Sequence, residues 1–312
     1  MTATVCKEDE HELLVRVMDF AMQGAWRKWD QVMSLDLSWN SLIYQLPPRL
    51  LSFALNATQL TLPTPDRLLV WKKTQTSACR LCHRPACSLF HILCNCSFSL
   101  SQKRYNWRHD SVLRTIEYVI SNCIRDQNER KLSSLTPRSI KFVPPGFKRT
   151  ALTYSSSCPG ILSHANDWQY LFDYDATPTV FPPSIYATDL RPDVVIWSTA
   201  SKTLVLIELT VPDEDNIADA HFRKKAKYED LVDACRLAGW DTYYQTVEVG
   251  VRGFVANSFS SCLKLLGVQR AIITRARSVA SRTALRCSYS IYLARNLPDW
   301  KPIELIYDAQ TA

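Results

Sequence analysis

The chain has 312 residues, which is enough for about two domains that each bury a core of their own. Its composition, with 46% hydrophobic and 21% charged residues, is that of a globular protein and excludes a fibrous or largely disordered chain. The net charge of +7 favours an anionic partner without requiring one, since many basic proteins bind no nucleic acid.

The cysteine content and the N-terminal residues indicate the cellular compartment. The 11 cysteines point to a reducing environment, where thiols serve as core residues or metal ligands. Residues 1–14 are polar and acidic, unlike a targeting segment, and no apolar run approaches the roughly 18 residues that cross a bilayer. We therefore predict an intracellular protein without a membrane partner.

Residues 1–78 form the first predicted region, which is helical. Apolar residues recur at helical spacing over 8–33, and 50–62 form a second apolar helix after the break at Pro47 and Pro48. The simplest interpretation is a pair of helices that pack in a core.

The next segment carries four residues at the spacing of zinc ligands, in the pattern C-x2-C-x8-H-x4-C. These residues are Cys79, Cys82, His91 and Cys96. Three thiolates and one imidazole suit a closed tetrahedral site for structural Zn²⁺. Cys94, Cys87 and His83 could substitute, so the fourth ligand stays open between Cys96 and Cys94. A metal-free segment is the other possibility, but a segment so poor in core residues needs a metal to fold.

Cations and aromatic side chains alternate after this cysteine-rich segment, before an apolar helix predicted at 112–124. Such a mixture suits phosphate contacts and base stacking, although a solvated helix start is an equally good interpretation. The predicted nucleic-acid contacts are Lys103, Arg104, Trp107 and Arg108, and His109 belongs to the same run. The cysteines and this helix make up the second predicted unit, 79–125.

Residues 126–165 are rich in Ser, Pro, Lys and Arg, which predicts a linker. A strand-like pattern begins at Asp167, so the third unit is predicted at 166–296 and a tail at 297–312. Because a linker separates the second unit from the third, we expect zinc removal to loosen the middle of the chain and leave the C-terminal sheet folded.

Two apolar runs in the third unit predict adjacent buried strands. Residues 194–197 are β-branched and aromatic, and residues 204–210 are apolar at almost every position. Because only a short polar segment separates the two runs, we expect the strands to form a hairpin. Asp193 lies at the start of one strand and Glu208 near the end of the other. A lone carboxylate in a dry strand is costly, whereas two that converge make a hard oxygen site of the kind Mg²⁺ prefers.

A helix follows Pro212, with acidic residues in its first turn where the helix dipole favours them. At about 100° per residue, Lys224 and Tyr228 fall on its buried stripe, Lys227 lies near the edge of the stripe, and Lys225 lies on the other flank. Lys224 therefore points towards the predicted carboxylates, and the three lysines are not equivalent.

These residues resemble the PD-(D/E)XK nuclease pattern, and more closely the restriction-like endonuclease domain of site-specific non-LTR retrotransposon polyproteins. In that family the lysine is moved from the strand to the next helix, in a K-x-x-K-Y arrangement, which accounts for Thr210 where most PD-(D/E)XK enzymes have lysine. The matching positions are Pro192 and Asp193, Glu208, Lys224, Lys227 and Tyr228. The cysteine-rich segment also resembles the CCHC zinc knuckle of the same polyproteins, whose spacing favours Cys96.

The resemblance implies an α/β fold with a PD-(D/E)XK restriction-endonuclease-like core, in which helices flank a mixed sheet. A helical region with a CCHC zinc knuckle would precede this core. Residues 1–78 would then be a thumb-side linker. It also implies a Mg²⁺-dependent endonuclease that nicks a target DNA strand. Asp193 and Glu208 would hold the ion, and Lys224 or Lys227 would stabilise the charge on the reacting phosphate. Arg252 is a further predicted nucleic-acid contact.

The implied partners are target DNA and the RNA of the element, and the implied location is the nucleus. The chain has no Y/F-x-D-D polymerase motif, so by itself it should not copy RNA. The alternative hypothesis is a nucleic-acid-binding remnant of a transposon that has lost cleavage, but the retained pair of acids and the lysine argue against it.

Overall fold

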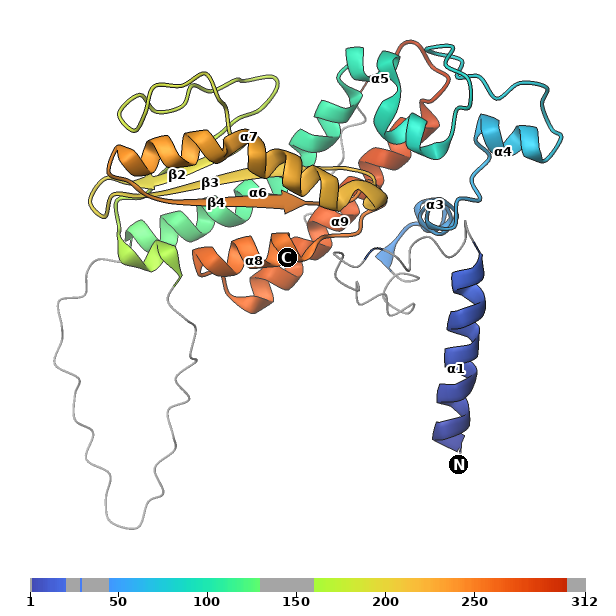
Figure 1. Ribbon diagram of the computed structural model, residues 1–312, viewed down its shortest axis with the longest axis horizontal. Helices are drawn as coiled ribbons and strands as arrows, with labels where there is room; N and C mark the ends of the chain where they lie inside the picture. The colour runs from blue at the N-terminus through green and yellow to red at the C-terminus, as the bar shows by residue number, and fades with distance from the viewer. Residues whose placement is uncertain (1, 21–28, 30–44, 130–159, 302–312) are drawn as a thin grey trace.

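The computed structural model describes residues 2–20, 29, 45–129 and 160–301 (Figure 1). Most of the predicted linker, part of the helix predicted at 8–33 and most of the predicted tail lie outside these residues. The helices are α1 (Thr2–Asp19), α3 (Pro48–Thr58), α4 (Pro65–Val70), α5 (Ser97–Ser101), α6 (Arg104–Glu129), α7 (Ile217–Leu237), α8 (Asn257–Leu266) and α9 (Arg270–Leu293), with short helical turns η2 (His91–Asn95), η3 (Ile161–His164) and η4 (Glu214–Asn216). Within the described residues, no helix combines the length and apolarity that crossing a membrane requires.

A four-stranded mixed sheet lies at the centre of the C-terminal half. Its strands are β1 (Gln169–Phe172), β2 (Val194–Ser198), β3 (Thr203–Thr210) and β4 (Asp241–Glu248), in the spatial order β1-β2-β3-β4. The first three are antiparallel neighbours, whereas β4 runs parallel to β3. A parallel neighbour needs a crossover connection, and α7 supplies it. The predicted hairpin of two buried strands is confirmed, because β2 and β3 pair directly and β3 is buried along its whole length.

Helices cover both faces of the sheet, so the fold is a mixed α/β arrangement (Figure 1). Val205, Ile207 and Leu209 of β3 pack into one core with residues of α6, α8 and α9. Leu204 and Leu206 pack into a second core with Tyr228 and Leu231 of α7. Side chains alternate between the faces of a strand, so Glu208 is on the α7 side.

α6 belongs to the core of the sheet, although the sequence predicts this helix in one unit with the zinc knuckle. The helix is longer than the 112–124 predicted, and its apolar stripe includes Val112, Ile116 and Ile120. This stripe packs in the same hydrophobic core as Val194 and Ile207 of the sheet. The predicted units 79–125 and 166–296 therefore share one core, because the apolar stripe of α6 packs on the face of the sheet opposite α7.

α3 packs against the same body. Phe53 of α3 contacts the rings of Tyr289 and Tyr292 on α9, at centroid distances of 5.1 and 5.4 Å. Leu50, Phe53 and Ala57 are buried in a core that also includes Cys79, Cys96 and Ile291. The prediction of a core helix in residues 50–62 is confirmed for α3, which ends at Thr58.

Candidate zinc centre and acidic centre

A tight turn holds the first two candidate zinc ligands. The N–H of Cys79 donates to the carbonyl of Arg84 (2.9 Å), and the N–H of His83 donates to the carbonyl of Cys79 (2.9 Å). His83 and Ala86 adopt left-handed backbone conformations, with φ of 59° and 58°, which lets the chain reverse sharply within a few residues. Cys82 lies within this turn, so the two thiols approach each other.

The other two ligands come from the next helical turn. His91 begins η2 and Cys96 immediately precedes α5, so one short segment returns an imidazole and a third thiol. The candidate ligand atoms of Cys79, Cys82, His91 and Cys96 all lie within 4.8 Å of one another. The Sγ atoms of Cys79 and Cys96 are 3.9 Å apart, and Cys82 Sγ is 3.3 Å from His91 Nε2.

These distances fit a tetrahedral Zn²⁺ site. Bond lengths of about 2.3 Å to sulfur and about 2.0 Å to nitrogen place neighbouring ligand atoms of a tetrahedron roughly 3.5 to 3.8 Å apart. The cluster includes Cys96 and not Cys94. The geometry therefore selects Cys96 as the fourth ligand.

The zinc cluster is attached to the start of α6 by hydrogen bonds. The N–H of Cys96 donates to the Tyr105 hydroxyl (3.0 Å), which in turn donates to the carbonyl of Ile92 (2.9 Å). Arg108 donates to the carbonyl of Leu93 (3.0 Å). The backbone between two candidate ligands, His91 and Cys96, is thus held by side chains of α6.

Three arginines predicted to contact nucleic acid are buried. Arg104 is fully buried and donates to the carbonyls of Ala294 (2.9 Å) and Leu297 (2.7 Å). Arg108 is buried and also donates to the hydroxyl of Ser288 (3.2 Å). A phosphate cannot reach these guanidinium groups in this structure, because backbone oxygens of α6's neighbours already surround them.

Arg252 is the third buried arginine. It pairs with Asp213 (3.1 Å) and Glu214 (2.6 Å), and donates to the carbonyl of Ala57 (3.2 Å). Burial raises the pKa of Glu214 to about 7, even though Arg252 opposes the shift. Arg252 therefore joins α3 to the turn before α7.

The remaining two residues of that predicted surface stay nearer the solvent. Lys103 is exposed and its Nζ lies 2.9 Å from Asp175 Oδ2. Trp107 is half-buried and packs edge-on against Trp300, with ring centroids 5.2 Å apart. Both side chains also have partners within the chain.

Asp193 and Glu208 lie opposite each other at one end of the sheet. Val194 pairs with Ile207 in the antiparallel register of β2 and β3, so the residues just beyond this pair, Asp193 and Glu208, face each other. The N–H of Asp193 donates to Glu208 Oε2 (3.3 Å), and the N–H of Leu209 donates to Asp193 Oδ2 (2.7 Å). The hairpin thus brings the two predicted carboxylates together.

α7 places its lysines as the helical periodicity predicts. Lys224 is half-buried and its Nζ donates to Glu208 Oε1. Lys225 is exposed, and Lys227 reaches the hydroxyl of Tyr228 (3.0 Å). Tyr228 is fully buried and donates to the carbonyl of Arg191 (2.9 Å), two residues before Asp193.

Burial and neighbouring charges act on the pKa of Glu208 in opposite directions. Burial raises the pKa of Glu208, the charge of Asp193 raises it further, and Lys224 opposes both effects. Burial and the charge of Glu208 also raise the pKa of Tyr228, so its hydroxyl remains neutral. The repulsion between two buried carboxylates is unfavourable, and the positive charge of Lys224 reduces it.

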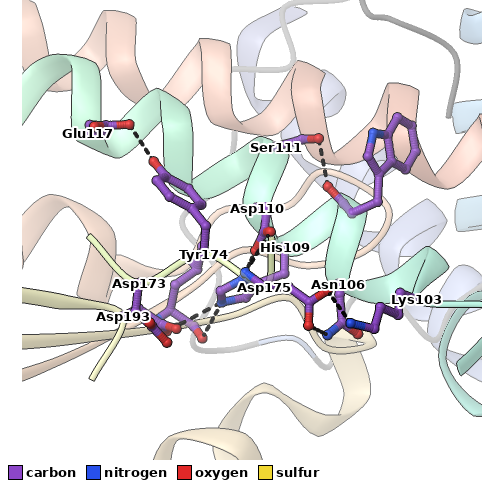
Figure 2. Close-up of polar contacts among 12 residues, drawn as sticks. Lys103, Asn106, His109, Asp110, Ser111, Glu117, Asp173, Tyr174, Asp175 and Asp193 are labelled. Carbon is purple, nitrogen blue, oxygen red and sulfur yellow. Dashed lines mark hydrogen bonds and ion pairs between the residues drawn. The ribbon is translucent and has the colours of Figure 1, made fainter. Parts of the chain in front are cut away.

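His109 is a contact of the acidic centre that the site predictions omit. Its Nε2 lies 3.3 Å from Asp193 Oδ2 and 3.2 Å from the carbonyl oxygen of Leu209, and its Nδ1 lies 3.1 Å from Asp110 Oδ1 (Figure 2). Burial lowers the pKa of His109, but hydrogen bonds to Asp110 and Asp193 outweigh it and raise the pKa to about 10. A signal was present in the sequence, because His109 precedes Val112 and Leu113 by one helical turn and lies on the same inward stripe.

β4 adds a second buried carboxylate beside the first. Glu208 pairs with Thr246, and Glu248 lies two residues further along the same face. His221 Nδ1 lies 2.6 Å from Thr246 Oγ1 and 3.3 Å from Glu248 Oε1. Because His221 precedes Lys224 by one turn, α7 presents a nitrogen to each buried carboxylate. Neither His221 nor Glu248 is among the predicted site residues.

Comparison with known proteins supports the zinc centre. Residues 20–102 match the zf-RVT family, described as zinc-binding in reverse transcriptase. No curated protein matches the chain. The matched range contains all four residues of the Cys and His cluster. The match and the cluster together indicate a zinc-binding domain similar to those of reverse-transcriptase-related proteins.

Proposed function

We propose that this protein is a Mg²⁺-dependent DNA endonuclease from a non-LTR retrotransposon, which nicks a target strand and carries a structural Zn²⁺ site. One observation above all supports the proposal. Asp193 and Glu208 face each other across β2 and β3, and Lys224 bonds to Glu208 from the helix that follows. The resemblance to restriction-like endonucleases assigns catalytic roles to these same three positions.

The donor set at the acidic centre fits Mg²⁺. Mg²⁺ prefers carboxylate oxygens and is usually bound by one or two carboxylates together with substrate phosphate. Asp193 and Glu208 supply carboxylates from adjacent strands, and the raised pKa of Glu208 reflects burial and the neighbouring negative charge. Asp193 and Glu208 would hold the ion, which would polarise the scissile phosphate and make bound water a better nucleophile.

The side chains of α7 have distinct proposed roles. Lys224 is close enough to Glu208 to help position it and, on substrate binding, to stabilise negative charge on the reacting phosphate. Lys227 lies over the ring of Tyr228, 4.6 Å from its centroid, at the exposed edge of the site. It would contact the DNA backbone there. Tyr228 holds the segment before Asp193 through the carbonyl of Arg191.

The proposed substrate is duplex DNA, and the RNA of the element is a further proposed partner. Both are polyanions, which suits a chain with a net charge of +7. Cleavage of chromosomal DNA would take place in the nucleus. A reverse transcriptase would then extend the nick.

The test is a nicking assay on supercoiled plasmid with zinc-loaded protein. Mg²⁺ is omitted in the control arm, because a chelator would also remove zinc. We expect open-circular plasmid with Mg²⁺ and none without it, and equal yields in the two arms would contradict metal-dependent cleavage. Plasmid binding without nicking would instead favour the second candidate, a transposon remnant that retains nucleic-acid binding alone.

A further inference from the structure

We infer that His109 is a positioning residue for Asp193, so that α6, the helix that follows the zinc cluster, completes the acidic centre. The inference rests on the proposed function for its activity readout. Three observations carry it: the contacts of the His109 ring, the place where those contacts meet the sheet, and the attachment of α6 to the zinc cluster.

Both nitrogens of the His109 ring face acceptors. Nε2 reaches Asp193 Oδ2 and the carbonyl of Leu209, while Nδ1 reaches Asp110 Oδ1. Asp110 also accepts the N–H of Asp175 (3.2 Å) through its other oxygen. The side chain of His109 is only 24% exposed, so water competes weakly for these hydrogen bonds. The contacts on both nitrogens therefore fix the orientation of the ring.

The Nε2 contacts fall at the point where the two candidate metal-binding carboxylates meet. Asp193 immediately precedes β2, and its side-chain position depends on hydrogen bonds to its carboxylate. Its Oδ2 is held by the N–H of Leu209 from β3 and by His109 from α6. Leu209 follows Glu208 directly. His109 therefore ties Asp193 to the β3 backbone next to Glu208, and this sets the separation of the carboxylates.

α6 fixes the position of His109 relative to the segment between β1 and β2. Lys103 and Asn106 bond to Asp175 (2.9 and 3.1 Å), and Glu117 accepts a hydrogen bond from Tyr174 (Figure 2). Lys103 immediately precedes α6, and Asn106 and Glu117 lie on the helix on either side of His109. A displacement of the helix would therefore move His109 away from Asp193.

The zinc cluster fixes the first turn of the same helix. Tyr105 and Arg108 bond to the backbone at Cys96 and Leu93, and both lie within one turn of His109. The zinc-binding segment thus acts on the acidic centre through α6 and His109. Residues that hydrogen-bond to a metal-binding side chain and orient it typically contribute about 10- to 100-fold in metal affinity or activity.

The test uses three variants at one position in the full-length, zinc-loaded protein. Gln places its side-chain nitrogen near the position of Nε2, whereas Asn places it near Nδ1. If His109 positions Asp193, H109Q should keep most of the activity, and H109N and H109A should lose it by about 10- to 100-fold in kcat while the Mg²⁺ concentration at half-maximal rate rises. His164, which is exposed, gives the matched control His164→Ala, expected to match wild type.

The outcomes separate the two proposals. Wild-type kcat and Mg²⁺ dependence in H109N and H109A would overturn the positioning role and leave the nuclease intact. An inactive wild-type protein would overturn the proposed nuclease function. The positioning role of His109 is then tested by Mn²⁺ binding, measured by electron paramagnetic resonance. Weaker Mn²⁺ binding in H109N than in H109Q supports the inference, and equal binding contradicts it. Comparing Asn with Gln keeps the test valid if H109A fails to fold.

Discussion

The three lysines near the middle of α7 differ in what their ammonium groups reach. Lys224 contacts Glu208, Lys227 contacts Tyr228, and Lys225 is exposed. If the acidic centre is catalytic, Lys224→Ala should lower the single-turnover nicking rate by about 10² to 10³, because it removes charge stabilisation made mainly in the transition state. Lys227→Ala should have a smaller effect and Lys225→Ala the smallest.

The matched lysine variants also report on binding. Fluorescence anisotropy with a DNA duplex should show that Lys224→Ala binds nearly as well as wild type. Equal nicking rates for Lys224→Ala and Lys225→Ala would show that α7 does not face the reacting phosphate.

The buried cluster of Arg252, Asp213 and Glu214 predicts an asymmetry between its members. Arg252→Ala leaves two uncompensated buried carboxylates, so the free energy of unfolding at pH 8 should fall by about 3 to 5 kcal/mol. Glu214→Gln keeps the shape and removes one charge, so its effect should be much smaller. Urea denaturation of both variants measures the difference, and equal losses would contradict a buried ion cluster.

The pH dependence of the same cluster has a defined sign. The pKa of Glu214 is about 7 in the folded protein, above the usual 4.5, so folding favours the protonated carboxyl. The contribution of Glu214 to stability is therefore greatest below pH 4.5 and falls as the pH rises to 7. The free energy of unfolding of wild type, relative to Glu214→Gln, should decrease across this window. A constant difference would show that Glu214 is ionised throughout.

At the scale of the elements, the strands and α7 could be predicted because their patterns are local. An apolar run at 204–210 and a stripe at helical spacing on α7 require no knowledge of distant residues. The hairpin then brings Asp193 to Glu208 by register alone. These parts of the candidate site follow from spacing within about 40 residues of the sequence.

The position of α6 could not be predicted in the same way. An apolar stripe shows that a helix packs against something, but any apolar surface satisfies it. The partners of Arg104, the carbonyls of Ala294 and Leu297, lie nearly 200 residues further along the chain. A basic residue beside aromatic ones therefore looks like a nucleic-acid contact in the sequence and is a buried anchor in the structure. His109 was missed for the same reason, since Asp193 lies 84 residues away.

α6 also changes what zinc removal should do. The sequence alone predicts that the sheet stays folded, whereas the structure places α6 in the core of the sheet and bonds its first turns to the zinc cluster. Chelation should therefore speed amide hydrogen exchange in α6 and also in β2 and β3. Unchanged protection of the strands after zinc loss would restore the view of two independent units.

At the scale of the whole molecule, one zinc ion per chain is expected. Metal analysis should give a stoichiometry of one for wild type and for Cys94→Ser, because Cys94 lies outside the cluster. Cys96→Ser should lose zinc, because a tetrahedral structural site needs all four ligands. Zinc retained in Cys96→Ser and lost in Cys94→Ser would reverse the ligand assignment.

Hydrogen bonds connect the Cys and His cluster to the first turns of α6, and His109 of α6 to Asp193 of the acidic centre. The central claim is that Asp193 and Glu208 together make this centre a Mg²⁺-dependent nuclease site. The most direct test is the single-turnover rate of plasmid nicking against Mg²⁺ concentration, for wild type, Asp193→Asn and Glu208→Gln. We predict a saturable rate for wild type and losses of at least about 10² in both variants, with zinc content unchanged. Nicking by both variants at the wild-type rate would place the chemistry elsewhere.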